Sequence, residues 1–326
     1  MPNRAAQTRP AVAVTRALPG SLAIPGAEIR VLGEKQSSAC ALNEFVAGAS
    51  IIVSMFSDKI DAATLDAAGP DLKGVCNFAV GYNNIDLDAC RERGVAVTNT
   101  PDAVTEGTAD LAWLLVLAVA RKLIAGDRFV RTGEWQENGP LGMADFMGRD
   151  LTGRTLLIVG AGRIGYAVAS RAKAWGMQIL YTARSRHWNF ELAPIAGRRV
   201  ELDDGLARAD VVSIHVPLTD QTHHLIDARR LALMKPTAII VNTARGPVID
   251  EAALVRALES NKIWGAGLDV FEREPEINPG LIDLDNVTMT PHIGSAEIRF
   301  REAMTEMVAA NAMAILAGET PPNMIS

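Results

Sequence analysis

The chain has 326 residues, enough for two ordinary domains with sizeable cores. Its formal net charge of −6 is modest, so neither a nucleic-acid surface nor a membrane surface is expected. The three cysteines lack disulfide or metal-ligand spacing, and residues 1–10 form a loose leader without the apolar stretch of a signal peptide. We therefore expect a cytoplasmic protein that holds no metal.

The N-terminal third alternates short β-rich runs with helical segments. The expected strands are Ala11–Thr15, Glu28–Leu32, Ile51–Ser54, Val75–Phe78 and Val95–Val97. Their spacing suits βαβ units, in which a helix connects two parallel strands. The first domain is therefore predicted to contain a parallel sheet.

A long helix is predicted next, from Asp102 to Ile124. It contains the apolar run Leu111–Ala120, which is too short to span a bilayer. A helix that is apolar all round is normally buried. Its partner is either the core of this chain or, in part, a second subunit. Residues 132–153 show little pattern and are expected to be irregular.

A second α/β series follows, and its six strands predict a doubly wound parallel sheet. These strands are expected at residues 155–159, 178–182, 211–215, 238–242, 265–269 and 287–290. A last helix is predicted from Ala296 to Ala317, ended by Gly318. Such a helix can return to cover the first domain.

The first strand of this series runs into Gly160, Gly162 and Gly165, with GxGxxG spacing and a helix directly after it. In dinucleotide-binding sites these glycines permit a tight turn, approach of the pyrophosphate and close packing of helix on strand. The strand–turn–helix context favours dinucleotide binding over a turn of purely structural use.

The end of the next strand indicates which dinucleotide is bound. An acidic residue usually holds the ribose hydroxyl of NAD at this point. Here the segment contains Arg184, Ser185 and Arg186 and no acid, which suits a 2′-phosphate. We therefore predict NADPH, with NADH as the weaker alternative. The other interpretation is a solvated basic loop.

Polar residues end or follow several predicted strands, at the edge where ligands of doubly wound sheets bind. They are His215, Arg245, Asp269, Glu274 and His292. Reduction of a carbonyl needs a proton donor, a role suited to histidine beside a carboxylate, and a guanidinium can hold a substrate carboxylate.

Arg245, Glu274 and His292 are one set able to fill these roles. Taken singly, each has a plain structural alternative: a loop cation, a solvated charge, and a capping or core histidine. The other histidines are interpreted as surface or helix residues: His187, His223 and His224.

With these residues in hand, the chain closely resembles the D-2-hydroxyacid dehydrogenase family, and within it the glyoxylate/hydroxypyruvate reductases. The resemblance runs from about residue 50 to the C-terminus in several ordered blocks. Besides the glycine loop, the blocks are residues 77–86, 94–101, 215–219, 234–246, 267–275 and 291–295.

The resemblance implies two Rossmann-like or flavodoxin-like domains with the active site in the cleft between them. The substrate domain would be residues 1–102 and 295–326, and the NADP-binding domain residues 103–294. It also implies a homodimer joined through the cofactor domains, an interface that Leu111–Ala120 would fit. Alternatives are a reductase of a bulkier 2-oxo acid and a dinucleotide-sensing corepressor-like protein.

Site residues carry over position by position. The resemblance implies catalytic roles for Arg245, Glu274 and His292, and backbone contacts from Val80 and Gly81 to the substrate carboxylate. Together with the glycine loop, the expected cofactor residues are Arg163, Ile164, His215, Pro217, Thr243, Ala244, Asp269 and Gly294. The implied reaction is reduction of a small 2-oxo acid, glyoxylate or hydroxypyruvate, to the D-2-hydroxy acid.

One departure concerns the substrate pocket. Reductases of this branch often carry a second Trp shortly after the one matching Trp135. This chain has Leu141 and Met143 in that region instead. The side chain of the preferred substrate is therefore left open, whereas the reaction type is not affected.

Overall fold

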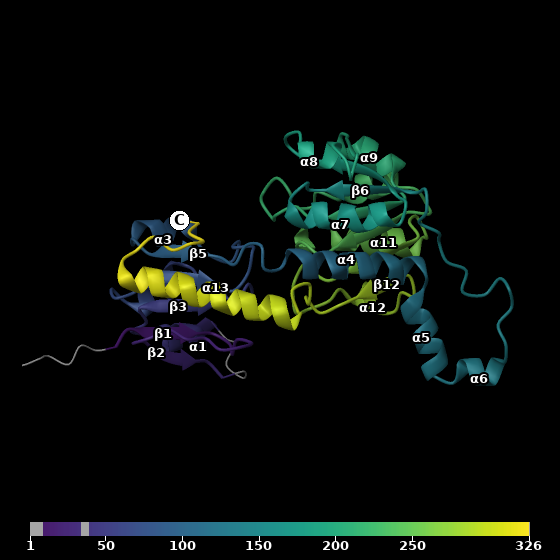
Figure 1. Ribbon diagram of the computed structural model, residues 1–326. Coiled ribbons are helices and arrows are strands. Elements are labelled where there is room, and N and C mark those ends of the chain that lie inside the picture. The colour runs from purple at the N-terminus through teal and green to yellow at the C-terminus, as the bar shows by residue number, and fades with distance from the viewer. Residues whose placement is uncertain (1–8, 34–38, 326) are drawn as a thin grey trace, which may run out of the picture. The chain divides into compact units, whose positions relative to one another are not determined.

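The computed structural model describes residues 9–33 and 39–325, so residues 1–8 of the leader expected at residues 1–10 lie outside the described part (Figure 1). The chain divides into two compact units. Unit 1 comprises Met1–Val104 and Ser295–Ser326, and unit 2 comprises Thr105–Gly294. Each unit contains one parallel sheet with helices on both faces, which confirms the predicted fold class. The assignment of the units to substrate and cofactor stays a prediction, as does the cleft.

Unit 1 has a five-stranded sheet in the order β2-β1-β3-β4-β5, and every pairing is parallel. Its strands are β1 (Ala11–Val14), β2 (Glu28–Val31), β3 (Ile51–Ser54), β4 (Gly74–Asn77) and β5 (Ala96–Thr98). Its helices are α1 (Ala39–Val46), α2 (Ala62–Ala68), α3 (Leu87–Glu92) and α13 (Ile298–Ala317).

The last helix belongs to the first sheet. Met304, Val308 and Ala312 of α13 are buried in one cluster with Val12 and Ile51 of the strands. Figure 1 shows α13, in yellow, alongside the strands of unit 1. Helices α1, α2 and α3 supply the core on the opposite face. Unit 1 is therefore built from both ends of the chain.

Unit 2 has a seven-stranded sheet in the order β12-β11-β10-β9-β6-β7-β8, again wholly parallel. Its strands are β6 (Thr155–Val159), β7 (Gln178–Thr182), β8 (Arg198–Arg199), β9 (Val211–Ile214), β10 (Ile239–Asn242), β11 (Gly265–Leu268) and β12 (Val287–Met289).

Nine α-helices and one 3-10 helix complete unit 2 in the described residues. They are α4 (Thr105–Ala120), α5 (Leu123–Arg131), α6 (Glu134–Asn138), α7 (Arg163–Ala174), α8 (Trp188–Glu191), α9 (Leu202–Arg208), α10 (Ala228–Leu233), η1 (Gly246–Val248), α11 (Glu251–Glu259) and α12 (Pro279–Ile282).

The central strands of unit 2 are buried on both faces, which explains their continuous apolar runs. On one face Leu115 of α4 and Val168 of α7 pack with Ile158, and on the other Leu254 of α11 packs with Leu157. The strand order reverses at β6, which lies between β9 and β7. Ligands of such sheets bind beyond the carboxyl ends of the strands at this reversal.

Two predictions about unit 2 were wrong in detail. The sheet has one strand more than predicted. The additional strand, β8, was missed because it is only two exposed residues long and carries no apolar pattern. The single helix from Asp102 to Ile124 is two helices, broken at Lys122, which has a positive φ of 52°. The carbonyl of Ala120 accepts the N–H of Arg149 at 2.8 Å, a long-range contact that sequence patterns do not reveal.

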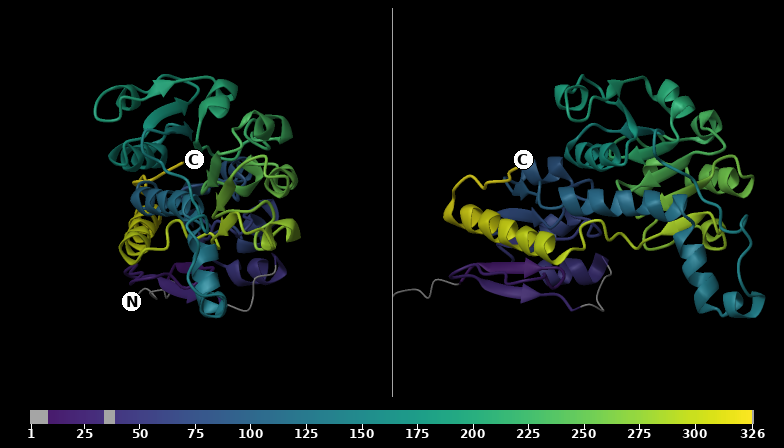
Figure 2. Two further views of the ribbon diagram at one scale, coloured as in Figure 1. Left: turned by 90° about the vertical axis from the view of Figure 1, so that its right-hand side faces the viewer. Right: turned by 45° about the vertical axis from the view of Figure 1, so that its right-hand side comes forward.

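The apolar run of α4 is largely buried within unit 2 itself. Burial in the core of its own chain thus accounts for most of its composition. Among the described residues, no helix combines the length and the apolar character needed to cross a bilayer. Residues 134–138, which were expected to be irregular, form α6 (Figure 2).

Candidate functional site

The glycine loop joins β6 to α7 in a tight turn. Gly160 has a φ of 104°, and a Cβ atom there would lie 2.7 Å from the carbonyl carbon of His215. A Cβ at Gly165 would lie 2.4 Å from the carbonyl oxygen of Gly160. A larger residue at either position would therefore separate α7 from the strand ends.

The same turn leaves room in front of α7. Gly162 is the N-cap of this helix, and a Cβ added there would meet nothing within 4 Å. A helix N-terminus presents N–H groups that have no intrahelical acceptor, which suits a phosphate. Across the described residues, Oγ1 of Thr243 is one of the few buried side-chain polar atoms without a hydrogen-bond partner.

These features fit a dinucleotide. The close approaches at Gly160 and Gly165 and the open space at Gly162 suit its pyrophosphate, and the buried hydroxyl of Thr243 can form a hydrogen bond with a ligand. The other predicted cofactor residues lie in loops or helix starts that follow strands of unit 2: Arg163, Ile164, His215, Pro217, Ala244 and Gly294.

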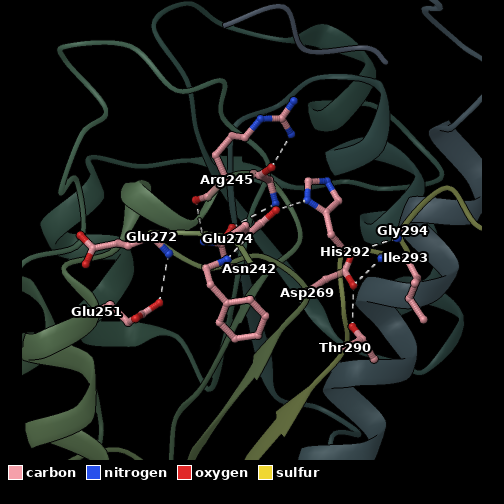
Figure 3. A network of polar contacts seen from close by, with 12 residues as sticks. Asn242, Arg245, Glu251, Asp269, Glu272, Glu274, Thr290, His292, Ile293 and Gly294 are labelled. Carbon is pink, nitrogen blue, oxygen red and sulfur yellow. Dashed lines mark hydrogen bonds and ion pairs between the residues drawn. The ribbon is translucent and has the colours of Figure 1, made fainter. Parts of the chain in front are cut away.

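Glu274 and His292 form the polar centre of unit 2. Oε2 of Glu274 lies 2.7 Å from Nδ1 of His292, and Oε1 accepts the N–H of Phe271 at 3.0 Å. The two side chains point toward one another (Figure 3) and are 26% and 22% exposed. Burial by itself would raise the pKa of Glu274, but His292, Phe271 and Arg245 lower it below its ordinary value. Glu274 is therefore not a solvated charge.

Arg245 lies beside this pair, in the loop after β10 (Figure 3). The Nδ2 of Asn242 donates to its carbonyl at 2.9 Å, and its own guanidinium donates to the carbonyl of Ala244 at 2.7 Å. Burial lowers the pKa of Arg245, while the charge of Glu274 opposes that shift. The sheet thus brings together all three side chains of the predicted catalytic set within unit 2.

Asp269 fixes the turn that carries His292. Its carboxylate accepts the hydroxyl of Thr290 at 2.6 Å and the N–H groups of Ile293 and Gly294, both at 2.8 Å (Figure 3). His292 has a positive φ of 54°, a conformation that a non-glycine residue holds only with support from its surroundings. Burial raises the pKa of Asp269, although these hydrogen bonds oppose the shift.

The predicted phosphate-binding residues are not equivalent. Arg184 and Ser185 are exposed after β7. The Nε of Arg186 donates to Oε2 of Glu191 at 2.6 Å, and its guanidinium lies 4.0 Å from the ring centroid of Trp188. Arg186 is therefore already paired with Glu191, a contact that the sequence pattern did not predict.

His215 follows β9 and lies beside the glycine loop. Its Nε2 is 2.8 Å from the hydroxyl of Ser213. Burial lowers the pKa of His215 to about 3, because a desolvated imidazole loses its charged form. His215 is thus a neutral residue of the predicted cofactor site.

His224 is a surface residue, as the sequence suggested, with its side chain 38% exposed. It lies in the loop before α10, and its Nε2 forms a hydrogen bond with Oε1 of Glu272. Glu272 is two residues from Glu274, so the His224–Glu272 pair involves the loop that carries Glu274. No predicted strand end or motif near His224 indicated this contact.

Comparison with known proteins identifies the family of this chain. Residues 113–294 match the family model described as "D-isomer specific 2-hydroxyacid dehydrogenase, NAD binding domain". A glyoxylate reductase of Thermococcus onnurineus is 50% identical over 297 residues, which cover 90% of this chain and 87% of the relative.

Solved structures agree as well. A protein from Thermus thermophilus has a TM-score of 0.90 and 42% identity, covering 97% of this chain and 100% of its own. An NADPH-dependent glyoxylate/hydroxypyruvate reductase from Sinorhizobium meliloti, solved with NADP and malonate, has a TM-score of 0.83 and 31% identity, covering 98% of this chain and 97% of its own. This chain therefore belongs to the D-isomer specific 2-hydroxyacid dehydrogenase family.

Proposed function

We propose that this protein reduces a small 2-oxo acid, glyoxylate or hydroxypyruvate, to the D-2-hydroxy acid with NADPH. The observation that carries the proposal is the Glu274–His292 pair beside Arg245, in the same unit as the glycine loop. The names of the Thermococcus and Sinorhizobium relatives support the choice of substrate.

The chemistry of the proposed site follows from its charges. A bound nicotinamide supplies the hydride that reaches the carbonyl carbon. Arg245 holds the substrate carboxylate through paired N–H donors. Because Nδ1 of His292 faces Glu274, the proton given to the substrate oxygen comes from Nε2. Glu274 fixes the orientation of the ring through its contact with Nδ1.

Val80 and Gly81 remain proposed contacts of the substrate carboxylate. In unit 1 the side chain of Asn99 donates to the carbonyl of Val80 at 2.8 Å, and that of Asn77 donates to the carbonyl of Gly81 at 2.8 Å. The peptide plane joins the Val80 carbonyl to the Gly81 N–H, so these bonds fix the direction in which that N–H points. A fixed N–H donor is suited to binding an anion.

For the cofactor, we propose that Arg184 and Ser185 bind the 2′-phosphate of NADPH and that Arg186 contributes less. Arg186 is paired with Glu191, whereas Arg184 is exposed. The guanidinium of Arg199 donates to the carbonyl of Ala183 at 2.9 Å, which adds positive charge where NAD-dependent relatives usually have an acid. The relative solved with NADP supports this preference.

We also propose a homodimer, formed through the segment 123–147 rather than through α4. No residue of α5 is buried, and Ile124, Val130 and Met143 are 52%, 53% and 99% exposed. Figures 1 and 2 show α5 and α6 projecting from the sheet of unit 2. A cavity of about 870 Å³ beside α5, lined in part by Phe129 and Trp264, offers a place for a second copy of this segment.

The test of the proposed reaction is a panel of 2-oxo acids assayed with NADPH and NADH side by side. The expected result is turnover of glyoxylate and hydroxypyruvate, with a lower KM for NADPH than for NADH. His292→Ala protein, purified in the same way, controls for contaminating reductases. Turnover below about one per minute for every acid would reject the proposal and favour a role in dinucleotide sensing.

A further inference from the structure

The loop that carries Glu274 connects β11 to α12. Its turn is closed by a bridge between Arg273 and Glu276. Within the loop, Oε1 of Glu274 accepts the N–H of Phe271, and Oε2 faces His292. The direction of the carboxylate therefore depends on where the backbone from Phe271 to Glu276 lies.

Glu272 ties this backbone to two other segments. Its N–H donates to Oε2 of Glu251 at 3.1 Å, and its side chain is hydrogen-bonded to Nε2 of His224. Glu251 is the first residue of α11 and is only 7% exposed. The backbone and the side chain of Glu272 are thus held by different partners.

His224 also contacts the segment that follows Arg245. Its N–H donates to the carbonyl of Pro247 at 2.7 Å, within the 3-10 helix η1. That helix lies directly against the Glu274 loop, since a Cβ at Gly246 would be 1.9 Å from the carbonyl of Phe271. His224 is therefore bonded both to the segment that presents Arg245 and to the loop that presents Glu274.

We propose that His224 is a positioning residue, which through Glu272 holds the Glu274 loop so that the carboxylate stays on Nδ1 of His292. The inference rests on the proposed function, because it assigns His224 a task in the same reaction. The His224 and Glu272 side chains are 38% and 25% exposed, so their pair contributes little to global stability. The backbone bond to Glu251 is independent of that pair and keeps the loop folded when the pair is removed.

The test uses full-length His224→Ala and Glu272→Gln proteins, with glyoxylate and NADPH as substrates. Loss of the pair should lower kcat by about tenfold, since an ångström of misplacement can cost ~10²-fold. The KM for NADPH should not change.

A matched control is His223→Ala. The His223 ring stacks on His224, with ring centroids 4.1 Å apart, but it is His224 that bonds to Glu272. This variant should keep the wild-type kcat. Arg245 and Asp269, the other charged groups that act on the Glu274–His292 pair, are retained in every variant. Thermal unfolding checks that each variant is folded, and Glu272→Gln is the milder substitution should His224→Ala unfold.

Glu274→Gln separates the two proposals. If this variant keeps the wild-type kcat, the proposed reaction is overturned. If it lowers kcat but His224→Ala and Glu272→Gln do not, only the positioning role is lost. Adding His224→Ala to Glu274→Gln should cause no further loss of kcat, and fully additive losses would also refute the positioning role.

Discussion

Oε2 of Glu274 and Nδ1 of His292 lie 2.7 Å apart, although the two residues come from different loops at the edge of one sheet. This contact fixes which imidazole nitrogen faces the acid and which is left to face a substrate. It also explains why a glutamate in a run of charged residues is held below its ordinary pKa.

His292→Ala should lower kcat for glyoxylate reduction by about 10²- to 10⁴-fold, the usual range for a positioned general acid. The KM for NADPH should stay near its wild-type value. Steady-state kinetics with saturating NADPH measure the effect. Near-normal turnover would contradict the proposed proton donor.

Arg245→Ala should chiefly raise the KM for the 2-oxo acid. Loss of a charge-assisted hydrogen bond corresponds to about 10- to 150-fold in kcat/KM. Arg245→Lys, which keeps the charge but not the paired donors, should recover only part of this loss. An unchanged KM for glyoxylate in the alanine variant would exclude the carboxylate contact.

Arg184→Ala should raise the KM for NADPH by about 10- to 150-fold and leave that for NADH nearly unchanged, since only NADPH carries the 2′-phosphate. Arg186→Ala is the matched control. It should have the smaller effect because Arg186 is already paired with Glu191. Equal losses with both cofactors would reject phosphate recognition by Arg184.

The lowered pKa of His215 predicts a pH-dependent contribution to stability. In the folded protein this imidazole binds a proton only near pH 3, whereas in the unfolded chain it does so near pH 6.5. The unfolded state therefore binds more protons between these values. The contribution is fully present above pH 6.5 and is lost as the pH falls toward 3.

Urea unfolding of the wild type and of His215→Gln between pH 7 and pH 4.5 tests this sign. The stability advantage of the wild type should shrink on acidification, by at most about 1.4 kcal/mol for each pH unit. A constant difference would contradict the lowered pKa of His215.

Ile124→Asp combined with Val130→Asp should convert the proposed dimer to a monomer, because two charges would have to be buried in an apolar interface. Size-exclusion chromatography with light scattering measures the mass. Leu233→Asp, at a position 37% exposed in α10, should leave the mass unchanged. A wild-type protein that is already monomeric would refute the interface.

Much of the fold is visible in local patterns. Short β-branched runs such as Val211–Ile214 and Ile239–Asn242 identify the buried parallel strands, because both faces of such strands meet helices. The tight turn at Gly160 can also be predicted from the sequence, because it depends on the backbone freedom of this one residue. The β8 strand and the break at Lys122 could not be predicted, because both depend on contacts with distant residues.

The candidate site, too, was predictable only in part from the sequence. Residue types and their places after strands were enough to nominate Arg245, Glu274 and His292, because parallel strands end at one edge of a sheet. Nothing local distinguishes Glu274 from its charged neighbours, or the partnered Arg186 from the exposed Arg184. Those distinctions arise from burial and from hydrogen bonds between segments far apart in the chain, which exist only once the sheet and its loops have assembled.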